Sequence, residues 1–161
     1  MMITAMPRWR AEHIDLAVPY AVISITDPPP DGEPAKIKQR WGLQGVLRLE
    51  FHDFDTHWDQ STLQTGYQGK RLSEWCMTKE HAEQVADFVY LMQGRIHELI
   101  VHCEAGASRS PSMAMAIAHV MNGSSYITWE GHQYHGVTPN KGVYEVTLAA
   151  MRKKELEVDS R

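Results

Sequence analysis

The sequence predicts a single α/β domain in which a mostly parallel central sheet is flanked by helices. Three observations lead to this fold class: a length of 161 residues, apolar strand-like runs that alternate with segments of helical periodicity, and capping residues at the ends of those segments. A chain of this length can bury one substantial core. We therefore treat residues 1–161 as one domain.

Two strands are expected in the first third of the chain. Segment 20–25 is short, apolar and β-branched, and the turn-rich segment 27–32 follows it. Segment 45–51 alternates apolar with charged residues, which predicts a second strand. Residues 56–77 are polar and Gln-rich without a clear period, so we expect a loop insertion there. Long loops within compact domains are often functional.

The second half of the chain predicts helices separated by one more strand. A helix should begin after the N-cap Thr78, and Gly94 should close it. Residues 99–101 form the third predicted strand. Segment 111–121 is rich in Ala and Met, with proline in its first turn and glycine past its end, which predicts a helix. Asn140 is a suitable cap for the last helix.

Composition excludes several function classes. The net charge is −4 and the pI is about 6.1, so the chain has no global basic field to attract nucleic acid or an acidic membrane surface. No segment approaches the length of a membrane span, and no apolar leader precedes the charged residues near the N-terminus. Two cysteines, Cys76 and Cys103, do not make a disulfide framework. We expect a monomer in a reducing compartment, the cytoplasm.

Residues 102–111 carry the strongest chemical signal. They follow an apolar strand and lead into a helix, a place where consecutive backbone N–H groups can converge on one anion. Gly106 permits a backbone conformation that a Cβ would obstruct, and Arg109 offers a planar fork of donors to two phosphate oxygens. The same positive environment favours the thiolate of Cys103, which could attack phosphorus in line.

The segment 102–110, which reads HCEAGASRS, resembles the active-site signature of the protein tyrosine phosphatase superfamily, and its dual-specificity branch in particular. Segment 135–143 is similar to the Pro-Asn-x-Gly segment that opens a late helix in these enzymes, and segment 21–25 resembles their early core strand. The resemblance extends from about Tyr20 to Arg152 and is strongest at the loop.

The resemblance implies a role for each residue of the loop. Cys103 would be the nucleophile, Arg109 the ligand of the phosphate and the transition state, and Ser110 the hydroxyl that eases departure of the thiolate. His102 would orient the loop rather than act as a base. The backbone amides of Glu104, Ala105, Gly106, Ala107, Ser108 and Arg109 would form the phosphate cradle.

The family also implies a general acid, an aspartate on a loop after an upstream strand. Asp53 follows the second predicted strand and is the first candidate, Asp55 is the alternative and Asp59 the third. Asp53 precedes Cys103 by 50 residues, farther than the family pattern, and the excess matches the loop at 56–77.

The expected activity is hydrolysis of phosphate monoesters, on phosphorylated proteins or small phosphate esters. Because the loop has Glu104 and no lysine, phosphotyrosine or an aryl phosphate is favoured over a phosphoinositide headgroup. A sulfurtransferase, an arsenate-reductase-like enzyme and a non-catalytic phosphate-binding module remain alternatives, as does a strand-end cysteine that lies beside an arginine by chance. No cofactor or metal is expected, since the pair His132 and His135 has no nearby Cys or carboxylate set.

Overall fold

The central sheet has five strands in the computed structural model, which describes residues 1–54, 75–131 and 136–160. All neighbouring strands are parallel, and their order is β3-β2-β4-β1-β5. The strands are β1 (Met2–Pro7), β2 (Tyr20–Thr26), β3 (Leu43–Glu50), β4 (Glu98–Cys103) and β5 (Thr128–Trp129).

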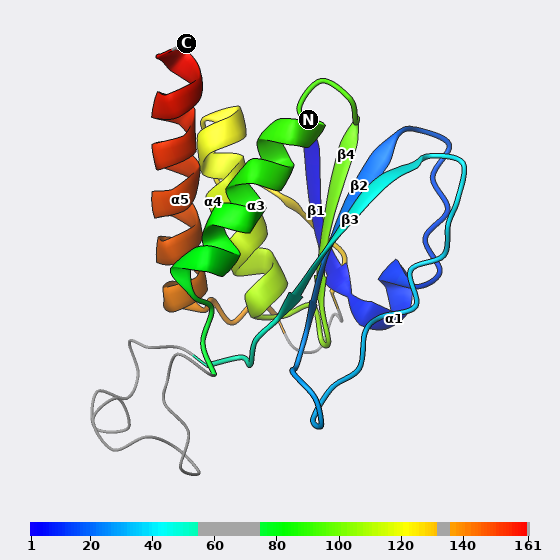
Figure 1. Cartoon of the computed structure of the whole chain (residues 1–161). Helices are drawn as coiled ribbons and strands as arrows, with labels where there is room; N and C mark the ends of the chain where they lie inside the picture. The colour runs from blue at the N-terminus through cyan, green and yellow to red at the C-terminus, as the bar shows by residue number, and fades with distance from the viewer. Residues whose placement is uncertain (55–74, 132–135, 161) are drawn as a thin grey trace, which may run out of the picture.

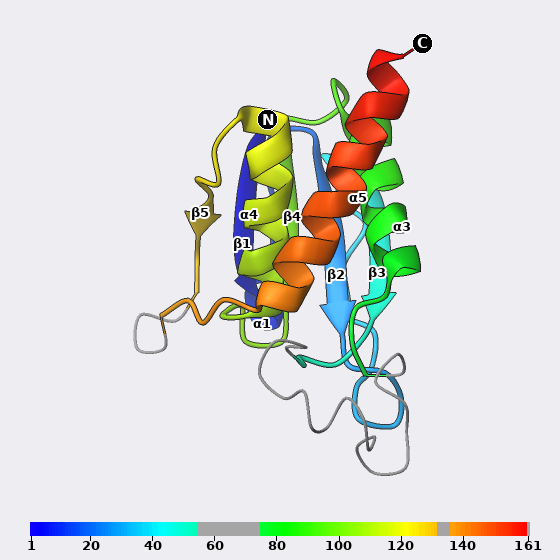
Figure 2. The same cartoon turned by 90° about the vertical axis from the view of Figure 1, so that its left-hand side faces the viewer.

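Strand β4 occupies the middle of the sheet. It pairs with β1 in a register that sets Cys103 opposite Pro7, and with β2 in a register that sets His102 opposite Ser24. Every residue of β2 and of β4 is buried, the pattern of strands that are covered on both faces. The strands point the same way (Figure 2), so their carboxyl ends share one edge of the sheet, and the end of β4 lies at the centre of that edge.

Three helices cover one face of the sheet: α3 (Lys79–Met92), α4 (Arg109–Asn122) and α5 (Lys141–Asp159) (Figures 1 and 2). Thr78 and His81 form a reciprocal capping box that starts α3, and the Asn140 side chain accepts a hydrogen bond from the amide of Val143 at the start of α5. Helix α4 ends at Gly123, whose φ of 69° is left-handed.

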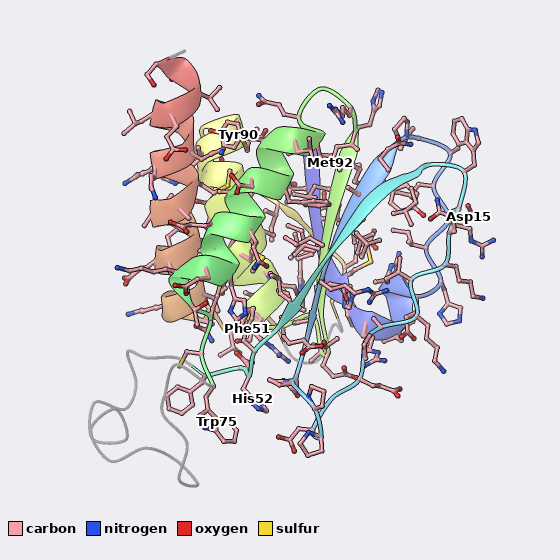
Figure 3. The ribbon with its side chains drawn as sticks, in the orientation of Figure 1. Asp15, Phe51, His52, Trp75, Tyr90 and Met92 are labelled. Carbon is pink, nitrogen blue, oxygen red and sulfur yellow. The ribbon has the colours of Figure 1, made fainter. Side chains whose placement is uncertain are left out.

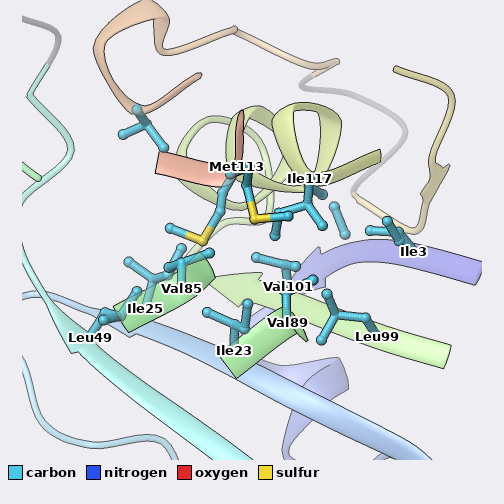
Figure 4. Close-up of a cluster of buried hydrophobic side chains, with 14 of the residues drawn as sticks. Ile3, Ile23, Ile25, Leu49, Val85, Val89, Leu99, Val101, Met113 and Ile117 are labelled. Atoms are coloured by element: carbon cyan, nitrogen blue, oxygen red, sulfur yellow. The ribbon is translucent and has the colours of Figure 1, made fainter. Parts of the chain in front are cut away.

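The main core lies between these helices and the sheet. Figure 4 shows Met113 and Ile117 of α4 facing side chains of β2 and β4, among them Ile23 and Val101. Val85 of α3 and its neighbours extend the same cluster toward β3. The apolar residues that recur at helical spacing in the sequence are therefore the residues whose side chains face the sheet.

A second, smaller cluster covers the opposite face. It contains Met6, Tyr20 and Ile100 from the sheet together with Ala11 of the short helix α1 (Arg8–Ala11). Burial on this side is supplied by α1 and by irregular chain rather than by long helices (Figure 1).

The architecture agrees with the predicted α/β class, and the sheet is fully rather than mostly parallel. Strands β1 and β5 and helix α1 were not predicted, because their short segments have no clear periodicity. The predicted strand at 45–51 is β3, which ends at Glu50. Most of the predicted loop insertion, residues 55–74, lies outside the described residues. In the described ranges, no helix has the length and apolar character needed to cross a bilayer.

Candidate active site at the carboxyl edge of the sheet

Cys103 is the last residue of β4, and its side chain is buried. Its Sγ lies 3.1 Å from Oγ of Ser110, which is fully buried in the first turn of α4. The loop between them therefore turns back so that the helix begins beside the end of the strand. This contact places a hydroxyl, which can donate or accept, beside the sulfur that the sequence predicts as a nucleophile.

In the loop that joins β4 to α4, backbone carbonyls are hydrogen-bonded to described residues, whereas the backbone amides of residues 105–109 are not. The carbonyls of Glu104, Gly106 and Ala107 accept hydrogen bonds from Arg8 N, Trp129 Nε1 and Thr138 N, at 3.2, 2.8 and 2.8 Å respectively. By contrast, the backbone N–H groups of residues 105–109 donate to no acceptor in the described parts of the chain. Five consecutive amides at a helix start are thus available to an anion.

Gly106 allows the tight path of this loop. Its φ is +70°, in the left-handed region. A Cβ at this position would lie 2.5 Å from the backbone nitrogen of Pro7 and 2.7 Å from the carbonyl carbon of Met6. The loop is therefore pressed against the end of β1, and only glycine fits.

Arg109 is buried at the start of α4, and one of its nitrogens is anchored. Nη1 donates to Oδ1 of Asp27 and to the carbonyl oxygen of Phe51, both at 2.7 Å. Neither Nε nor Nη2 bonds to any described residue, and Nε is buried. The Nε–Nη2 edge, which carries two parallel N–H groups suited to two oxygens of an oxyanion, is therefore left without a protein partner in the described ranges.

Asp53 is exposed, and its hydrogen bonds link the loop after β4 to the start of α5. Its Oδ1 accepts hydrogen bonds from Oγ of Ser108 at 2.8 Å and from Nδ2 of Asn140 at 3.0 Å. Among described residues no donor bonds its Oδ2. The structure thus brings Asp53 to the loop that contains Cys103 and Arg109, while the alternative acid, Asp55, lies outside the described residues.

His102 precedes Cys103 in β4 and is fully buried. Its Nε2 is 2.8 Å from Oγ of Ser24, across the pairing of β4 with β2. Burial lowers the pKa of His102 to about 4, so the ring is neutral near pH 7. A neutral imidazole held between two strands is suited to a structural role.

Asp27 and His52 were not singled out from the sequence. Asp27 directly follows β2, and His52 lies with its Nδ1 3.7 Å from the Asp27 carboxylate. The ring centroids of His52 and Trp75 lie 4.3 Å apart, and the ring planes are inclined by 33°. Figure 3 shows both side chains beyond the end of β3. The rule that ligands bind beyond the carboxyl ends of parallel strands could have identified Asp27, because β2 is the neighbour of β4.

Comparison with family models, with curated proteins and with solved structures finds no match to this chain. Within the described residues, no group of three or more His, Cys, Asp or Glu side chains is placed to hold a metal ion. Both cysteines are free thiols.

Proposed function

We propose that this protein hydrolyses phosphate monoesters through a cysteinyl-phosphate intermediate on Cys103. One observation carries the proposal: a buried cysteine is followed by five amides without acceptors in the described chain and by an arginine whose Nε–Nη2 edge is unbonded there. A tetrahedral oxyanion is the kind of acceptor that amides at a loop and helix start, together with a guanidinium edge, can bind. The resemblance of segment 102–110 to the protein tyrosine phosphatase signature supports the same reaction.

In the first step the thiolate of Cys103 attacks phosphorus and the bond to the ester oxygen breaks. The loop amides and Arg109 stabilise charge on the three non-bridging oxygens, which is the electrostatic part of the catalysis. Asp53 gives a proton to the departing oxygen. The Asp53 Oδ2 is suited to carry that proton, since both hydrogen bonds that Asp53 accepts from described residues go to Oδ1.

In the second step water attacks phosphorus and Asp53 takes its proton, so the carboxyl group returns to its starting form. The phosphorus–sulfur bond breaks and inorganic phosphate leaves. The hydroxyl of Ser110, 3.1 Å from Sγ, donates a hydrogen bond to the thiolate that is released. No cofactor is needed at either step.

Phosphorylated proteins, with phosphotyrosine or mixed specificity, are the proposed substrates. Glu104 is exposed on the loop, and its carboxylate is paired with the Arg8 guanidinium at 3.4 Å. The loop has no lysine, so it offers no further positive charge to a headgroup that carries several phosphates. A single phosphate on an aryl group needs only the cradle and Arg109.

The test is turnover of p-nitrophenyl phosphate with and without a metal chelator. Cys103→Ser should lower kcat by at least about 10³-fold while phosphate still binds, and Arg109→Ala should lower kcat/KM by at least about 10²-fold. The matched controls are Cys76→Ser and Arg95→Ala, which change the same residue types elsewhere and should keep the activity. Normal turnover by Cys103→Ser would exclude the mechanism.

The role of Asp53 needs substrates with different leaving groups. Asp53→Asn should lose more activity on phenyl phosphate than on p-nitrophenyl phosphate, because the poorer leaving group depends more on a proton donor. If Asp53→Asn loses little activity, and equally little on both substrates, Asp53 is not the general acid. That outcome would favour sulfur transfer, which requires no such donor.

A further inference from the structure

A cavity of about 530 Å³ lies on the face of the sheet that α3, α4 and α5 leave uncovered. Met2, Thr4 and Met6 of β1 form its floor, whereas Ile3 and Ala5 face the helix-side core. Its outer wall comes from segment 9–16, and Figure 3 shows Asp15 of that segment on the side of the sheet opposite the helices. Its volume is that of a small-ligand site, and none of its lining residues belongs to the loop at 103–110.

A buried carboxylate lines this cavity. Glu98, the first residue of β4, is only 8% exposed. Its Oε1 accepts a hydrogen bond from Oγ1 of Thr4 at 2.6 Å. In the described ranges Glu98 has no cationic partner and no hydrogen bond to its other carboxylate oxygen. That second oxygen is not fully buried, so it is accessible from the cavity. A cation bound there would supply the counter-charge that the described chain does not provide.

The other carboxylates of the cavity are paired, Glu130 with Arg10 and Asp15 with Arg40 at 3.8 Å. Glu98 is therefore the lining carboxylate for which the described chain supplies no cation. His13 also lines the cavity, with Nδ1 2.6 Å from the carbonyl oxygen of Trp9.

The remaining wall favours one type of cation. The indole of Trp9 lines the cavity and is 58% exposed, which leaves its ring accessible to a ligand. Ile14 and Leu16 supply apolar surface beside it. A guanidinium group stacks on an aromatic face and binds a carboxylate through two N–H groups, while an alkyl stem suits the aliphatic wall.

We propose that this cavity binds a guanidinium group carried on an alkyl stem, with Glu98 as the ion-pair partner and Trp9 as the stacking surface. The group could belong to an arginine side chain of a partner protein or to a free alkylguanidine. Both sources offer the same chemistry. The proposal does not depend on the phosphatase activity, since no residue of the phosphate cradle takes part.

Isothermal titration calorimetry with the full chain tests the proposal. The probes are N-acetyl-arginine methylamide and agmatine, and the control is the citrulline analogue of the first, which has a similar shape and no charge. We expect saturable binding of at least one guanidinium probe and at least roughly tenfold weaker binding of the citrulline compound. Binding of agmatine alone identifies a free alkylguanidine, and binding of the arginine compound identifies a peptide side chain.

Variants then locate the site. Glu98→Gln keeps an acceptor for Thr4 and should weaken guanidinium binding at least roughly tenfold. Trp9→Ala changes an exposed side chain, so it should fold normally and also weaken binding. Glu83→Gln neutralises a carboxylate on α3 and should have no effect. Equal affinity for the arginine and citrulline compounds, unchanged affinity in both cavity variants, or no saturable binding of either guanidinium probe would overturn the proposal.

Discussion

Nη1 of Arg109 lies 2.7 Å from Oδ1 of Asp27, although the two residues stand 82 positions apart in the chain. They meet because β2, which Asp27 follows, is the neighbour of β4 in the sheet. The carboxylate anchors one end of the guanidinium and leaves the other edge for a ligand. Asp27 is thus a positioning residue in the proposed reaction.

Asp27→Ala should lower kcat/KM for p-nitrophenyl phosphate by roughly 10²-fold, because a misplaced guanidinium loses contact with the transition state. Asp27→Asn keeps an acceptor oxygen and should lose much less activity. When Asp27→Ala is combined with Arg109→Lys, the losses should be clearly less than additive, since both changes act on one interaction. Full activity of Asp27→Ala would contradict the positioning role.

Asn140 has two functions that can be separated by substitution. Its Oδ1 caps α5 and its Nδ2 donates to Asp53. Asn140→Ala should lose about 1 kcal/mol of unfolding free energy together with activity. Asn140→Asp keeps the cap but replaces the donor with a carboxylate, so we expect nearly normal stability and reduced kcat. Urea unfolding and steady-state kinetics on both variants check this; normal kcat in Asn140→Asp would mean that the contact with Asp53 has no catalytic effect.

Two left-handed glycines offer a matched pair. Gly106 and Gly123 have φ values of +70° and +69°, but a Cβ would collide with the β1 backbone only at Gly106. Gly123→Ala should cost only the backbone strain, roughly 1–2 kcal/mol. Gly106→Ala should cost clearly more and should reduce phosphate binding, because the loop must move. Similar effects at both positions, measured by thermal melting and phosphate titration, would show that the close approach to β1 is unimportant.

Stability should fall in mild acid because of His102. Its folded-state pKa of about 4 lies below the ordinary value of 6.5, so the unfolded chain binds the proton more readily. The stability present above pH 6.5 is therefore lost as the pH falls toward 4. We expect His102 to account for about 2 kcal/mol of the decrease in unfolding free energy between pH 7 and pH 4.5. His102→Gln should flatten this dependence, whereas His97→Gln, an exposed control, should not.

The local sequence was sufficient to predict a loop between a strand and a helix at residues 103–110, but it did not predict which distant residues contact that loop. Cys103, Gly106, Arg109 and Ser110 lie in one short segment, so their order alone predicts a cradle at the end of a strand. The site also needs contacts between distant segments, such as that of Arg109 with Asp27, and these depend on the order of strands in the sheet. Strand order is not visible in local periodicity, which also explains why two-residue β5 was not expected.

The same limit applies to the proposed general acid. Three aspartates follow the second predicted strand, and sequence alone ranks them only by distance from its end. The hydrogen bonds of Asp53 to Ser108 and Asn140 come from two segments that lie 55 and 87 positions away. Those separations explain why the placement of Asp53 required the folded structure.

The inner position of β1 has a consequence during synthesis. Met2 at the start of the strand pairs with Glu98, and the register continues to Pro7 opposite Cys103. At about 5–20 residues per second, translation needs roughly 5–20 seconds to supply β4 after β1. Throughout that interval both hydrogen-bonding edges of an apolar strand have no partner, which exposes the nascent chain to aggregation. A protein of this topology should therefore depend on chaperones more when translation is slow between β1 and β4 than when it is slow after α4.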